Sequence, residues 1–422
     1  MSKAIAPVRG MNDVLPAQIG GWQRLEQETR ELFAIYGYDE MRVPVVEHTE
    51  LFKRSIGEYT DIVEKEMYTF IDTGGDSLTL RPEATAGLLR AVISNGMLRG
   101  ARLKLWSAGP MFRHEKPQKG RYRQFHQIDL EALGFAGPDV DAELIALTAR
   151  LWRRLGITRV KLQINSLGTP AARAAYREQL VAYFQRHESA LDEDSRRRLG
   201  GNPLRILDSK NVAMRELIAG APVLGDWLDE ESQAHFAQLR ASLDDCGIAY
   251  EVNPRLVRGL DYYSRTVFEW TTDALGAQDA ICSGGRYDGL IGMLGGESTP
   301  GIGCALGMER VVELMGVAPA AEPPHVYVII AGAAAERCAL AVAERLRDRP
   351  EGWRVHVNLG GGSFKTQFRR ADQSGAALAL ILGEGEVERG VVGMKALRAD
   401  AAAQSEVPLA VVAERVAAGL AK

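Results

Sequence analysis

The sequence has few cysteines and no long apolar run, and both absences limit the kind of protein it can be. The four cysteines lie far apart in 422 residues, and no two of them form a C-x-x-C pair. Such scattered cysteines are typical of reduced thiols, so we predict a cytoplasmic protein. The N-terminus has no apolar segment of the kind found in secretory signals. No run of about 18 apolar residues occurs either, so we predict no membrane span.

Neither the spacing of the histidines nor the net charge points to a metal site or to a nucleic-acid partner. The seven histidines form no H-E-x-x-H motif, so we predict no metal-binding site. The formal net charge is −4 and the isoelectric point lies near 6.1, so the chain as a whole does not attract nucleic acid. A nucleic-acid partner would have to be bound by a local basic patch. The length allows about three domains.

A proline-rich segment, residues 317–324, separates two regions of different pattern and is predicted to be a linker. Beyond it, apolar strand-like segments alternate with helical patterns. This alternation predicts a C-terminal α/β domain over residues 325–422, with a largely parallel sheet. The expected strands are 326–330, 353–359 and 376–382, and the expected helices are 333–347 and 363–374.

The region before the linker, residues 1–320, is predicted to be an α+β domain, because its strand-like segments follow one another like hairpins. An antiparallel sheet flanked by helices is expected. One helix is predicted over 140–155, with Asp139 as its N-cap and Gly156 as its stop. Strand patterns vanish between about 169 and 247, which predicts a mainly helical insertion. The expected strands lie within 67–81, 103–132, 158–165 and 262–307.

The segment Arg81-Pro-Glu-Ala-Thr85 follows a strand-like stretch and has two interpretations. The carboxylate of Glu83 and the hydroxyl of Thr85 could hold a substrate ammonium group. Alternatively, Pro82 and Glu83 belong to the first turn of a helix, where both residue types are favoured.

A second segment, residues 109–131, reads as strand, loop and strand. The two-residue period places Arg113 and Glu115 on one face of the first strand. On the second strand Gln127, Asp129 and Glu131 share a face, whereas the apolar residues between them point toward the core. The charged row therefore faces either a cleft or solvent.

The loop between these strands is the densest basic cluster in its part of the chain, with Lys116, Lys119, Arg121 and Arg123 within eight residues. Contact with phosphate groups is one interpretation, and a solvated hairpin tip is the other.

Two glycine-rich segments follow. The pair Gly284 and Gly285 allows close approach of the backbone to a ligand, or marks a turn. Residues 301, 303, 305 and 307 are glycine or alanine, so one face of this strand is nearly bare and could accept an adenine. Arg310 falls in the first turn of a predicted helix over 308–315, where a phosphate is favoured. A dinucleotide fingerprint does not fit, because the next glycine comes four residues after Gly303 rather than three.

These segments resemble the signature motifs of class II aminoacyl-tRNA synthetases, and more narrowly those of histidyl-tRNA synthetases. The resemblance covers nearly the whole chain. Lys116 departs from it, because similar enzymes often carry arginine there. The class II motifs are matched by Pro44, by 112–115 and by 301–310; the histidyl-specific peptides are matched by 258–263 and 284–289, the family's N-terminal signature by 9–16, and its anticodon-binding domain by 364–372.

The resemblance implies a class II synthetase fold with a C-terminal anticodon-binding domain, and histidine–tRNA ligase activity. Such an enzyme activates L-histidine with ATP and Mg²⁺, releases pyrophosphate, and transfers histidine to the 3′ end of tRNA(His). A cytoplasmic homodimer is implied as well. Two alternatives remain: a catalytically inactive regulatory paralogue that senses histidine or tRNA, and a class II synthetase for another amino acid.

The resemblance also implies roles for individual residues. The catalytic arginines, which contact the α-phosphate and the carboxylate, are Arg113 and Arg258. Histidine is held by Glu83, Thr85 and Gln127 at its ammonium end and by Glu131, Tyr262 and Tyr263 around the imidazole. ATP is held by Phe125 and Glu115 at the adenine and by Arg121 and Arg310 at the outer phosphates. The residues expected to bind tRNA are Lys116, Gln118, Lys119, Lys365 and Arg369.

Overall fold

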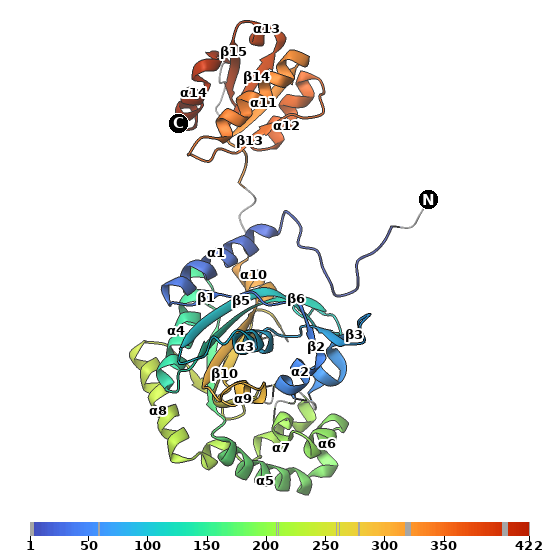
Figure 1. Ribbon diagram of the computed structural model, residues 1–422, viewed down its shortest axis with the longest axis vertical. Helices are drawn as coiled ribbons and strands as arrows, with labels where there is room; N and C mark the ends of the chain where they lie inside the picture. Colours follow the sequence, from blue (N-terminus) through green and yellow to red (C-terminus); the bar gives the residue numbers. More distant parts are fainter. Residues whose placement is uncertain are drawn as a thin grey trace. The chain divides into compact units, whose positions relative to one another are not determined.

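The computed structural model divides the chain into two compact units, Met1–Ala318 and Pro319–Lys422 (Figure 1). The boundary falls within the proline-rich segment, of which residues 317–321 lie outside the described residues. None of the described helices is long and apolar enough to cross a membrane. The structure describes residues 4–57, 60–207, 209, 211–258, 260, 262–276, 279–316, 322–398 and 404–421.

The first unit is built on an eight-stranded sheet with the order β1-β5-β6-β11-β10-β9-β7-β8. Its six central strands are antiparallel to their neighbours, as the sequence predicted, and only the two short edge strands pair in parallel. The strands are β1 (Asp39–Glu40), β5 (Leu103–Phe112), β6 (Gln124–Leu133), β11 (Gly301–Gly307), β10 (Ala280–Arg286), β9 (Ser264–Thr271), β7 (Lys161–Ser166) and β8 (Glu251–Val252).

The segment 67–81 does not join this sheet. It forms β3 (Tyr68–Ile71) and β4 (Ser77–Leu80), which pair with β2 (Val46–His48) in a separate three-stranded sheet. The helix α2 (Thr49–Ile56) follows β2 in the chain, and α3 (Thr85–Ser94) follows β4.

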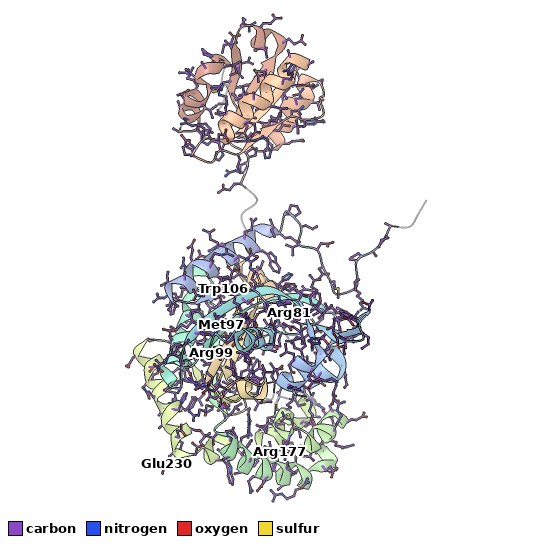
Figure 2. The ribbon with its side chains drawn as sticks, viewed as in Figure 1. Arg81, Met97, Arg99, Trp106, Arg177 and Glu230 are labelled. Carbon is purple, nitrogen blue, oxygen red and sulfur yellow. The ribbon has the colours of Figure 1, made fainter. Side chains whose placement is uncertain are left out.

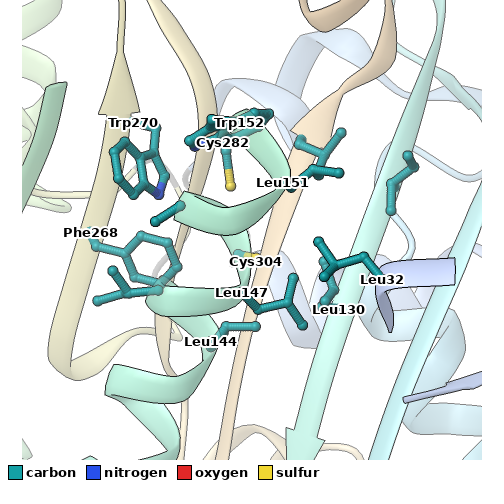
Figure 3. Close-up of a cluster of buried hydrophobic side chains, with 14 of the residues drawn as sticks. Leu32, Leu130, Leu144, Leu147, Leu151, Trp152, Phe268, Trp270, Cys282 and Cys304 are labelled. Carbon is teal, nitrogen blue, oxygen red and sulfur yellow. The ribbon is translucent and has the colours of Figure 1, made fainter. Parts of the chain in front are cut away.

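One face of the main sheet packs against α1 (Ile19–Ile35), α4 (Pro138–Leu155) and α10 (Met308–Met315). Alternate residues of β6, including Ile128 and Leu130, are fully buried there against the apolar stripe of α4. Figure 3 shows Leu130 with Leu144, Leu147 and Leu151 of that helix, next to Cys282 and Cys304. Each buried leucine stabilises the fold by about 1.5–3 kcal/mol relative to an exposed one.

The ends of α4 test the predicted caps. Gly156 ends the helix with a φ of 74°, in the left-handed region, as predicted. The prediction of Asp139 as N-cap was wrong, because the helix begins at Pro138 and Gly137 is its N-cap. Asp139 lies in the first turn, where its negative charge suits the helix dipole.

The predicted insertion contains α5 (Pro170–Arg186), α6 (Glu193–Gly200), α7 (Arg215–Ala219) and α8 (Glu230–Asp245). Figure 2 labels Arg177 on α5 and Glu230 at the start of α8. Leu239 and Leu243 of α8 pack into the core beside α4, whereas Tyr176 of α5 packs in a second apolar cluster that also contains Leu89 of α3 and Leu133 of β6.

The second unit contains a five-stranded sheet with the order β13-β12-β14-β15-β16. The strands β12 (Val326–Ala331), β13 (Val355–Val357) and β14 (Leu378–Gly383) are parallel. The prediction of a largely parallel sheet missed β15 (Val391–Ala396) and β16 (Ser405–Pro408), which pair antiparallel. The helices are α11 (Ala333–Arg347), α12 (Phe364–Gln373), α13 (Glu384–Glu388) and α14 (Val412–Leu420).

Candidate active site

A cleft of about 670 Å³ opens on the face of the main sheet opposite the core of Figure 3. Its walls come from β6, β10 and β11, from the start of α3, and from the loop between β5 and β6. Segments that are far apart in the sequence therefore meet here. The expected site residues that line the cleft are Glu83, Thr85, Arg113, Glu115, Gln118, Arg121, Phe125, Gln127, Arg258, Tyr262, Tyr263 and Arg310.

Five expected site residues lie elsewhere. Glu131 is fully buried beneath the cleft. Lys116 and Lys119 are exposed on the loop, and Lys119 forms an ion pair of 2.6 Å with Glu313. The other two, Lys365 and Arg369, are exposed on α12 of the second unit.

Glu83 combines both interpretations of its segment. One carboxylate oxygen accepts a hydrogen bond of 3.1 Å from the backbone N–H of Ala86 in the first turn of α3. The same buried carboxylate lines the cleft. Burial raises the pKa of Glu83, and the bond from Ala86 and the charge of Arg113 partly offset that rise. The group thus supports the helix and also offers negative charge to a ligand.

Glu131 is held from two sides. The hydroxyl of Thr85 donates to one oxygen at 2.6 Å, and the hydroxyl of Tyr287 donates to the other. Burial raises the pKa of Glu131 well above its usual range. A side chain at position 303 would collide with this carboxylate, which explains the glycine there.

The bare face of β11 is only partly available to a ligand. A Cβ at Gly301 would lie 2.5 Å from the ring of Tyr287, so the aromatic side chain already occupies that end. At Gly307 a Cβ would meet only the side chain of Arg310, at 3.8 Å. The end of the strand at Ala305 and Gly307 is therefore the part that can receive an adenine.

The paired glycines of β10 have neither of the expected roles. A side chain at Gly284 would collide with the carbonyl of Gly303, and one at Gly285 would lie 2.5 Å from the carbonyl of Thr266. These glycines let the neighbouring strands β9 and β11 approach closely.

Five arginines line the cleft: Arg205, which pairs with Asp61 at 3.1 Å, and four that are expected site residues. Arg113 donates to the carbonyl of Pro82 at 2.9 Å and lies 5.2 Å from the ring centre of Phe125. Arg258 donates to Glu269 at 2.7 Å. The other two are Arg121, which pairs with Glu115, and Arg310, which donates to the carbonyl of Gly120 at 3.0 Å.

Arg310 is repelled by two of the other arginines. Burial lowers the pKa of Arg310, and the nearby charges of Arg113 and Arg121 lower it further. Guanidinium groups nevertheless remain protonated at neutral pH. A polyanion bound between them would relieve the repulsion, so this wall of the cleft suits a chain of phosphates.

Two residues of the site, Asp129 and Tyr287, were not among the residues expected from the sequence. Asp129, in the period-two row of β6, lines the cleft with a buried carboxylate. Tyr287 holds Glu131, and its neighbour Arg286 forms a fully buried ion pair of 2.7 Å with Asp141. The peptide 284–289 is thus largely structural.

The other peptide expected to be specific for histidine, 258–263, is described only in part, because residues 259 and 261 lie outside the described residues.

Among the residues that the structure describes, no cluster of three or more histidine, cysteine, aspartate or glutamate side chains could hold a metal ion.

Comparison with known proteins identifies the family. The family model described as Histidyl-tRNA synthetase matches residues 10–311, and the one described as Anticodon binding domain matches residues 325–418. The chain is similar to the apo histidyl-tRNA synthetase of S. aureus, with 34% identity and a TM-score of 0.81 over 98% of this chain and 100% of that one.

Two more distant structures share the fold. The histidyl-tRNA synthetase of Nostoc sp. PCC 7120 is 19% identical, with a TM-score of 0.67 over 99% of this chain and 100% of that one. A Bacillus halodurans protein described as an ATP phosphoribosyltransferase regulatory subunit/histidyl-tRNA synthetase is 22% identical, with a TM-score of 0.63 over 88% and 97%. The family match over residues 10–311 and the 34% identity along nearly the whole length show that the chain belongs to the histidyl-tRNA synthetase family.

Proposed function

We propose that the protein is a histidine–tRNA ligase, which joins L-histidine to tRNA(His) through a histidyl-adenylate. One observation carries the proposal: a single cleft places buried acidic groups at one end and five arginines along its wall. An amino acid with a free ammonium group and a nucleoside triphosphate together complement that distribution of charge.

The acidic end suits histidine. Glu83, Thr85 and Gln127 offer acceptor atoms for the ammonium group. Tyr262 and Tyr263 are buried with their rings 4.6 Å apart and form an aromatic wall for the imidazole. Glu131 acts from beneath, because its carboxylate orients the hydroxyl groups of Thr85 and Tyr287.

The basic wall suits ATP. Arg113 and Arg258 would hold the α-phosphate and the carboxylate of histidine, and Arg121 and Arg310 would hold the outer phosphates. Phe125 and Glu115 would contact the adenine. Magnesium enters as part of the Mg–ATP substrate, and Glu66 in the cleft wall would offer an oxygen ligand of the kind that it prefers.

The first step needs no proton transfer. The carboxylate of histidine is ionised at neutral pH and attacks the α-phosphorus, while the bond to pyrophosphate breaks. The arginines align the two reactants and stabilise the negative charge that develops on the phosphate oxygens. In the second step a 3′-terminal ribose hydroxyl of the tRNA attacks the adenylate carbonyl, loses its proton, and expels AMP.

The tRNA contacts are proposed on two surfaces. Lys116, Gln118 and Lys119 are exposed on the loop beside the cleft, where an acceptor end would enter. Lys365 and Arg369 are exposed four residues apart on α12, on one face of that helix. A cytoplasmic homodimer is proposed from the family alone.

Pyrophosphate exchange with each of the twenty amino acids in turn tests the proposal. Exchange is expected with histidine alone. Exchange with threonine or proline would identify another class II synthetase, and histidine binding without any exchange would identify the regulatory alternative. A matched control is Arg159→Ala, because Arg159 forms an exposed ion pair with Asp273 away from the cleft and its loss should leave exchange unchanged.

A further inference from the structure

Asp129 is a buried carboxylate that lines the cleft, and one of its oxygens has no hydrogen-bond partner in the described part of the chain. Only 2% of the residue is exposed, and its Oδ2 has no hydrogen-bond donor among the residues that the structure describes. An unpaired buried carboxylate is costly to a fold, so its presence in the wall of the cleft calls for an explanation.

The nearby cations do not fill this position. Arg81 donates to the carbonyls of Pro110 and Val43, at 2.9 and 3.1 Å. Arg113 donates from Nε to the carbonyl of Pro82. Burial raises the pKa of the Asp129 carboxyl well above its usual range, and the charge of Glu83 raises it further, against the opposing effect of the two arginines. Among the residues that the structure describes, no cation forms an ion pair with this carboxyl, although Arg81 and Arg113 act on it electrostatically.

A second acceptor without a donor among the described residues lies near Asp129 on the same strand. Gln127, two residues earlier on the same face of β6, lines the cleft, and its Oε1 also has no donor among the described residues. Glu131, two residues later, differs, because both of its oxygens accept hydrogen bonds from hydroxyl groups. Within this row of three described residues, the acceptors without donors therefore belong to Gln127 and Asp129.

We propose that Asp129 is a further substrate-binding residue, whose Oδ2 accepts a hydrogen bond from the ammonium group of the bound amino acid, beside Gln127 and Glu83. The assignment rests on the proposed function. An ammonium group carries one positive charge and three N–H donors, which matches three acceptors of which two are carboxyl groups. An imidazole offers a single N–H from each ring nitrogen and would leave acceptors of this set unpaired.

Calorimetric titration of the full-length protein with three ligands tests the assignment. L-histidine and histamine both carry the ammonium group, whereas imidazole-4-propionate has the ring and the carboxylate without it. Asp129→Asn should weaken histidine and histamine by about 10- to 100-fold, the range expected for a hydrogen bond to a charged group. The affinity for imidazole-4-propionate should change by no more than about twofold. A tenfold change would need a loss of about 1.4 kcal/mol, and this ligand has no ammonium contact with Asp129 to lose.

Two further variants sharpen the test. Asp129→Ala removes the acceptor and should weaken the ammonium ligands at least as strongly. Asp226→Asn is the matched control, because Asp226 is exposed in the helical insertion and does not line the cleft; its affinities should equal those of the wild type.

The outcomes separate the hypotheses. A wild type that binds no histidine contradicts the proposed function itself. If the wild type binds histidine, the assignment of Asp129 is overturned by unchanged affinities in both variants, or by an equal loss for all three ligands, which would point to the imidazole. Unfolding of both variants would also overturn it, since Asp129 would then serve the fold.

Discussion

The two units of this protein differ in the polar and charged side chains that they bury. In the first unit, one side of the main sheet is mainly apolar, with a buried ion pair between Arg286 and Asp141, and the other buries Glu83, Asp129 and Glu131. In the second unit both sides of the sheet pack apolar side chains. Its buried polar residues include Gln367, which is satisfied by hydrogen bonds to both backbone groups of Ile330, at 2.8 and 2.6 Å.

The difference indicates what each unit binds. Buried charge destabilises a fold, so it persists where an ion pair, as between Arg286 and Asp141, or a small ligand with complementary charge offsets the cost. The second unit instead keeps its charged residues at the surface, where Lys365 and Arg369 are exposed. Exposed basic residues suit a large polyanion that is contacted without being enclosed. The comparison predicts that substitutions in the two units will affect different assays.

The largest effect is expected from the cleft. Arg258→Ala should lower kcat for pyrophosphate exchange by about 10²–10³-fold, because one stabilising donor to the developing charge is lost. Arg258→Lys should restore little, since lysine lacks the planar fork that contacts two oxygens. Steady-state exchange kinetics measure both. Near-normal exchange in the alanine variant would remove Arg258 from the catalytic group and weaken the contrast between the units.

Core truncations should separate the stabilities of the units. Leu380→Ala, in the fully buried β14, should destabilise the second unit by about 2–5 kcal/mol and leave exchange intact. Leu130→Ala should destabilise the first unit by a similar amount, about 2–5 kcal/mol, and reduce exchange on warming. Scanning calorimetry should resolve two transitions that move independently. A single transition shifted by both variants would show that the units unfold together.

A smaller effect is expected at the surface of the second unit. The double variant Lys365→Ala, Arg369→Ala should raise KM for tRNA by about tenfold, and lower the salt dependence of binding by roughly 0.7–0.9 per lost charge. Pyrophosphate exchange should not change, because neither residue belongs to the cleft. Charging assays across a salt series provide the measurement. Equal salt slopes for variant and wild type would indicate that α12 does not contact the tRNA.

The smallest effect concerns Asp229, the N-cap of α8. Hydrogen bonds from the hydroxyl of Thr169 and the backbone of Ser232 lower its pKa to about 2. The native pKa is below the unfolded one, so this stabilisation is present above about pH 4 and is lost as the pH falls toward 2.

Asp229→Ala should therefore cost about 1 kcal/mol at pH 7 and less at pH 3, in the first unit only. Asp229→Asn keeps a capping side chain and should lose the pH dependence but little stability. Urea unfolding at both pH values measures the difference. An equal cost of the alanine substitution at pH 7 and pH 3 would contradict this role.

Much of this architecture could be predicted from local patterns. The period-two row of β6 correctly separated the core face, with Leu130, from the cleft face, with Asp129. The helix that ends at Gly156 was also predicted. The predictions failed where pairing partners are distant: 67–81 forms its own small sheet, and β15 and β16 join the second sheet antiparallel.

The sequence by itself determined which residues could serve the site, because backbone geometry makes side chains alternate along a strand and makes guanidinium groups suitable for phosphates. It also determined the family, through peptides that are short and local. Only the tertiary structure decided that Arg258 and Arg310 reach the same cleft as Arg113, and that Tyr287 covers Gly301. Those contacts depend on how strands far apart in the chain pair, and the free energy of pairing comes from packing across the whole sheet rather than from any local segment.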